Sequence, residues 1–101
     1  MTENIHTVII SKDLADLIPV FFRNRQKEVE ALRSALAAGD FEQLRQLGHR
    51  MKGVGNSYGF AMVSELGRRV EDDARAGDKT AIDACIVEYA DYLSKVQIVY
   101  E

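Results

Sequence analysis

The tripeptide Ala-Gly-Asp occurs twice in this chain, at residues 38–40 and 76–78, and each copy can end one helix and start the next. Glycine readily adopts the left-handed conformation that follows a helix end. Aspartate accepts hydrogen bonds from the unpaired amide groups at a helix start. Each copy therefore predicts a tight turn between two antiparallel helices.

Apolar residues recur at steps of three and four from Ser11 onward, as expected for helices that each bury one face. We expect a short helix after Ser11, a second helix with Pro19 in its first turn, and helix ends at Gly39, Gly59 and Gly77. The last helix is expected to continue to Val96. The stretch Thr7-Val8-Ile9-Ile10 is rich in β-branched residues, which predicts an extended conformation.

These boundaries predict an all-α protein. We expect an antiparallel up-down-up-down four-helix bundle over residues 11–101, with the short N-terminal helix across one end and an extended arm over residues 1–10. A chain of 101 residues is long enough for one such domain. A bundle alone indicates no function, so the function must come from residues that the bundle does not need.

Composition excludes several classes of protein. Thirteen Lys and Arg residues against sixteen Asp and Glu residues argue against binding to nucleic acid, which requires a basic excess. No apolar run reaches the roughly 20 residues that span a bilayer, and the first residues lack the pattern of a secretory signal. Cys85, His6 and His49 are too few for a zinc site. We expect a cytoplasmic protein with no metal, membrane or nucleic-acid partner.

The third expected helix, which begins after Asp40, carries an unusual solvent face. With about 100° per residue, Arg45, His49, Lys52, Gly53 and Asn56 lie on the side away from its apolar stripe. A glycine inside a helix costs about 1 kcal/mol relative to alanine. An exposed glycine one turn from His49 therefore indicates that open space is needed there.

Charge on this helix supports the same interpretation. Residues 43–64 contain three cations (Arg45, Arg50 and Lys52) and no acid, within a chain of net charge −3. A positive field around an exposed imidazole would suit a phosphoryl group or an acidic partner surface. Exposed histidines and cationic faces are, however, commonly solvated surface with no further role. Composition and spacing by themselves leave both interpretations open.

The segment His49-Arg50-Met51-Lys52-Gly53, followed by Gly59, resembles the signature of histidine-phosphotransfer (HPt) domains. The similarity extends from about Leu14 to about Val96, and the family's fold is the bundle expected above. One departure is Val54, where the family often has serine, and this change should alter packing more than chemistry.

The resemblance implies a phosphocarrier and not an enzyme. His49 would be the phosphoacceptor, Lys52 would stabilise the phosphoryl group, and Arg45, Gly53 and Asn56 would belong to the face that docks a response-regulator receiver domain. The chain would need no cofactor of its own, because Mg²⁺ is expected in the receiver. A hybrid sensor kinase is a further candidate partner. The alternative is a helical interaction module that docks receivers or dimerises without carrying phosphate.

Two other functions fit the residues poorly. The glycines between Gly53 and Gly59 follow an amphipathic helix, whereas a dinucleotide-binding loop follows a strand. Hydrolysis by a nucleophile and base is disfavoured because we expect no serine, cysteine or acid beside His49. Cys85 falls on the apolar stripe of the last helix, where we expect an inert buried thiol.

Overall fold

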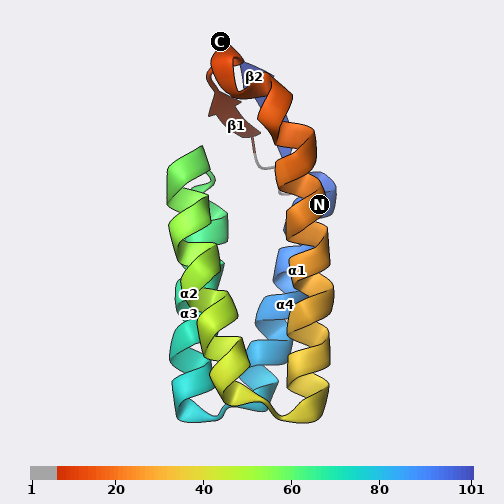
Figure 1. Cartoon of the computed structure of the whole chain (residues 1–101), viewed down its shortest axis with the longest axis vertical. Helices are drawn as coiled ribbons and strands as arrows, with labels where there is room; N and C mark the ends of the chain where they lie inside the picture. Colours follow the sequence, from red (N-terminus) through yellow and green to blue (C-terminus); the bar gives the residue numbers. More distant parts are fainter. Residues whose placement is uncertain (1–6) are drawn as a thin grey trace, which may run out of the picture.

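The computed structural model describes residues 7–101, so His6 and the rest of residues 1–6 lie outside the described part of the chain. Its four α-helices are α1 (Ile18–Ala38), α2 (Phe41–Tyr58), α3 (Ala61–Ala76) and α4 (Lys79–Lys95). Figure 1 shows them side by side and joined by short turns at alternating ends of the bundle, with α2 against α3 and α1 against α4.

The turns have the chemistry that the sequence predicts. Asp40 and Asp78 each accept a 3.1 Å hydrogen bond from the backbone amide three residues later, at the starts of α2 and α4. Gly39, Gly59 and Gly77 end the preceding helices with φ angles of 67°, 82° and 68°. Residues with side chains rarely adopt these angles. The predicted helix ends at these three glycines are confirmed.

A 3-10 helix, η1 (Lys12–Leu17), leads into α1. The Ser11 side chain accepts a hydrogen bond from the amide of Asp13, as an N-cap does. Pro19 lies in the first turn of α1, where its missing amide hydrogen leaves no helical bond unmade. The backbone therefore passes directly from the 3-10 helix η1 into α1, with no loop between them.

The all-α prediction missed a small parallel sheet, in which β1 (Thr7–Ile10) pairs with β2 (Gln97–Tyr100). Thr7–Ile10 is extended, as expected, but the periodicity that we extended through the last helix does not hold beyond Lys95. The last residue of β1, Ile10, is 2% exposed and packs in the core of the bundle. Strand β2 forms because β1, at the opposite end of the described chain, supplies its hydrogen-bonding partner. The spacing of apolar residues within β2 does not indicate that such a partner exists.

Helices α2 and α3 are packed closely enough for their backbones to meet. A Cβ atom on Gly48 would lie 2.7 Å from the Glu71 nitrogen and the Gly67 oxygen, and one on Gly55 would lie 2.5 Å from the Ser64 nitrogen. Only glycine fits such a contact. The close approach brings side chains of α3 within reach of α2, which sets the geometry of the site described below.

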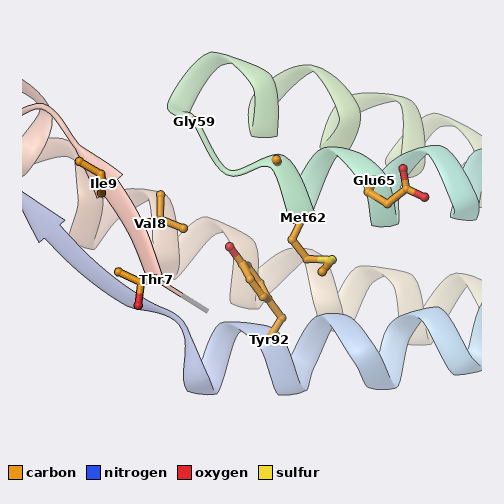
Figure 2. Close-up of a pocket in the computed structure, with 8 residues that line it drawn as sticks. Thr7, Val8, Ile9, Gly59, Met62, Glu65 and Tyr92 are labelled. Carbon is orange, nitrogen blue, oxygen red and sulfur yellow. The ribbon is translucent and has the colours of Figure 1, made fainter. Parts of the chain in front are cut away.

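A cleft of about 570 Å³ opens where β1 faces α3 and α4. Figure 2 shows Met62 of α3 and Tyr92 of α4 extending from their two helices beside Val8, with Glu65 farther along α3. The Glu65 carboxylate pairs with Arg68. None of the residues that line this cleft belongs to the His49 face. Within residues 7–101, no helix combines the length and apolar character needed to cross a membrane.

Candidate functional site

His49 lies in the middle of α2, and 68% of its side chain is exposed. Helical geometry turns it away from the core because Leu44, Leu47 and Met51 of the same helix are buried. The predicted exposed position of the imidazole is confirmed. A group with this exposure can be reached by the active site of another protein.

The structure places a carboxylate beside this imidazole, which the sequence analysis did not anticipate. Glu71 of α3 has a side chain only 4% exposed, and its Oε2 lies 3.3 Å from Nδ1 of His49. Its other oxygen, Oε1, accepts a 3.0 Å hydrogen bond from Nζ of Lys52. The expectation that no acid lies beside His49 is therefore wrong, because the acid comes from the neighbouring helix.

Arg75 also joins the site, one turn after Glu71 on α3. Its guanidinium donates a 3.2 Å hydrogen bond to the same Oε2 that faces His49. The hydrogen bond from Lys52, together with the charges of Lys52 and Arg75, holds the pKa of the Glu71 carboxyl below its ordinary value. Glu71 is therefore an ionised carboxylate surrounded by three basic side chains.

Arg45 is also paired with a carboxylate. Its guanidinium donates two hydrogen bonds, of 3.1 and 2.7 Å, to the Glu42 carboxylate one turn earlier on α2. The positive field that we expected along this helix is thus largely neutralised, by Glu42 at one end and by Glu71 from α3. Counting charges along one segment missed both partners.

Gly53 and Asn56 extend the His49 face toward the end of α2, and both are exposed. A Cβ atom on Gly53 would have no neighbour within 4 Å. The space above this part of the helix is open, as we expected from an exposed glycine. Between the two residues, Val54 turns inward and packs partly against the core.

The sequence matches the Hpt domain family over residues 16–98, which is most of the chain and includes all four helices. The chain belongs to the Hpt domain family. Hpt domains carry phosphoryl groups on histidine in phosphorelays and interact with the receiver domains of response regulators. Comparison with curated proteins and with solved structures found no match.

The remaining chemical groups of this Hpt domain lie away from His49. Cys85 is 1% exposed, and burial raises the pKa of its thiol, so it has the character of the inert buried cysteine that we expected. Among residues 7–101, no three His, Cys, Asp or Glu side chains gather as metal ligands would. The described chemistry is concentrated on the α2 face and on the Glu71 carboxylate beneath it.

Proposed function

We propose that this Hpt domain is a phosphocarrier in which His49 accepts a phosphoryl group from the aspartyl phosphate of a receiver domain and passes it to another receiver or back. The observation that carries the proposal is the contact between the exposed imidazole and the buried Glu71 carboxylate. A carboxylate beside Nδ1 favours a proton on that nitrogen. The lone pair of Nε2, on the other side of the ring, is then available as the nucleophile.

In the proposed transfer, a bond forms between Nε2 and phosphorus while the bond from phosphorus to the aspartyl oxygen breaks. The aspartate leaves as a carboxylate, and the imidazole gains positive charge that Glu71 offsets through Nδ1. Phosphoryl transfer has a loose transition state, so positioning and neutralisation of charge are the main contributions of the protein. Return transfer to a receiver follows the same steps in reverse.

Lys52 is the residue that we propose to stabilise the phosphoryl oxygens. It lies one turn from His49 on the same face, and 39% of its side chain is exposed. Its present hydrogen bond to Glu71 keeps it near the imidazole. We expect Mg²⁺ to be supplied by the receiver, and the carrier to need no cofactor of its own.

For docking, we propose that Arg45, Gly53 and Asn56 form the surface against which the receiver lies. Gly53 contributes by leaving open space, and Asn56 offers an exposed amide. Arg45 contributes less net charge than its sequence position suggests, because Glu42 is bound to it. A receiver domain of a hybrid sensor kinase is one candidate partner, and such signalling would place the protein in the cytoplasm.

The test is incubation of the purified protein with phosphorylated receiver domains from the same source, followed by detection of acid-labile, base-stable phosphate. We expect the wild-type protein to be labelled. His49→Gln should keep the helical circular dichroism of the wild type and acquire no label. Labelling of histidine in that variant would disprove the assignment, whereas no labelling of the wild type by any receiver would favour the interaction module.

A further inference from the structure

The cations around His49 differ in whether an acid already neutralises them. Arg45, Lys52 and Arg75 are all paired with carboxylates. Lys27 of α1 and Arg50 of α2, by contrast, form no ion pair with any carboxylate of residues 7–101. A cation that is not ion-paired can interact with a partner's acid without first breaking an existing bond. The two sides of His49 therefore offer different electrostatics to an approaching protein.

Lys27 and Arg50 line the same groove between α1 and α2. This groove has a volume of about 300 Å³, and its lining includes Asn24, Arg25 and Glu28 of α1. A neighbouring hollow of about 430 Å³ shares Arg50 and continues toward the start of α2, where Asp40 and Glu42 also line it. The cationic part of this surface is therefore the groove that holds Lys27 and Arg50. Arg50 follows His49 in the sequence but lies about 100° farther around α2, so the groove runs along the flank of the helix next to the face that carries His49.

The floor of the groove adds a third cation. The Arg25 side chain is 10% exposed, and its buried Nε has no hydrogen-bond partner, although it lies 3.0 Å from Oε1 of Glu28. That oxygen accepts a 2.7 Å hydrogen bond from the Tyr89 hydroxyl, which holds the Glu28 carboxyl inside the bundle. Three cations thus line a groove that contains one acid, Glu28, which pairs with Arg25 and Tyr89 and lies within electrostatic reach of Arg50.

We propose that this α1–α2 groove docks an acidic surface segment of the receiver domain and so speeds association of the receiver with the α1 side of His49. The inference rests on the proposed function, because it assumes that a receiver reaches His49. Charge complementarity favours the α1 side of His49, since Glu71 already neutralises the cations on the α3 side. Lys27 and Arg50 would contact Asp or Glu side chains of the receiver while its phosphoaspartate faces Nε2.

The test compares two double variants that lower the net charge equally. Lys27→Glu with Arg50→Glu reverses the charge of the groove. The matched control, Lys12→Glu with Lys79→Glu, reverses two cations that also form no ion pair with residues 7–101 and that lie outside the groove, in η1 and at the start of α4. Phosphotransfer from a phosphorylated receiver is followed as a second-order rate constant and as the rate at saturating receiver, at low and at high salt.

We expect the groove variant to lose roughly tenfold or more in the second-order rate constant at low salt, because electrostatic steering acts on association. Its rate at saturation and its circular dichroism should stay close to wild type, and its dependence on salt should weaken. The control variant should change the second-order constant by less than about twofold.

Three results would overturn the docking assignment. An equal loss in both variants would show that total charge matters and the groove does not. A groove variant with the wild-type second-order rate constant would show that Lys27 and Arg50 have no part in docking. A shift from dimer to monomer in size-exclusion chromatography, seen only in the groove variant, would assign the groove to a second copy of the chain. If the wild-type protein accepts no phosphoryl group from any receiver, the proposed function fails, and the docking assignment that assumes it fails too. If the wild type is labelled and one of the three results above is found, only the docking assignment fails.

Discussion

Nδ1 of His49 lies 3.3 Å from Oε2 of Glu71, so an exposed imidazole of α2 lies beside a buried carboxylate of α3. The same carboxylate accepts hydrogen bonds from Lys52 and Arg75. One carboxylate of the neighbouring helix therefore lies beside the proposed phosphoacceptor and also binds the proposed phosphate-binding lysine.

Removing the Glu71 carboxylate should affect the tautomer of His49 before it affects the fold. In Glu71→Ala, nothing favours a proton on Nδ1, so we expect more of the tautomer protonated on Nε2 and a phosphorylation rate lower by roughly tenfold or more. Nitrogen NMR shifts of the imidazole and single-turnover transfer from a phosphorylated receiver measure the two effects.

Glu71→Gln is the matched control for that experiment. Its amide oxygen can still face Nδ1, so we expect the tautomer to be largely restored and the rate to recover in part. If Glu71→Ala keeps both the wild-type tautomer and the wild-type rate, Glu71 does not position His49.

Adding one methyl group at Gly48 should separate α2 from α3. Its Cβ would lie 2.7 Å from backbone atoms of both Gly67 and Glu71, and backbone atoms cannot move aside cheaply. We expect Gly48→Ala to lower the free energy of unfolding by about 1–3 kcal/mol, measured by urea denaturation. Stability equal to wild type would show that the two helices tolerate a wider separation.

Gly53 should respond in the opposite way, because a Cβ atom at this position would have open space around it to a distance of 4 Å. We expect Gly53→Gln to leave the free energy of unfolding unchanged or raise it by up to about 1 kcal/mol, since glutamine is the better helix former. Phosphotransfer should nevertheless be blocked by the bulk added to the docking face. Gly53→Ala should impair transfer less, and full transfer by Gly53→Gln would show that the open space is incidental.

The pH dependence of stability should reveal the charge on Glu71. Its pKa is lowered in the folded protein, chiefly by the hydrogen bond from Lys52, so the carboxylate stabilises the fold above its unfolded pKa. That contribution is lost as the pH falls through the folded pKa. Between about pH 5 and about pH 3, we expect the free energy of unfolding to fall less steeply in Glu71→Gln than in wild type. Parallel curves would contradict an ionised Glu71.

The helix ends could be predicted because their causes are local. Asp40 and Asp78 cap amides only three residues away, and Gly39 and Gly77 need only their own backbone freedom. The position of His49 on the solvent side of α2 follows equally from helical spacing. The partner of Arg45, Glu42, is also local, since it lies one turn earlier on α2. It was missed because the charge was counted over residues 43–64, a segment that begins just after Glu42.

The sequence by itself determined four capped helices and one exposed histidine among small and basic residues, because capping and amphipathic periodicity act over a few residues. Only the tertiary structure decided that Glu71 lies beneath His49, because that contact depends on how closely Gly48 and Gly67 let two helices approach. Pairing of β1 with β2 was also a tertiary outcome. Both strands are rich in β-branched residues, which favour an extended backbone, but this composition does not say which distant segment each strand pairs with.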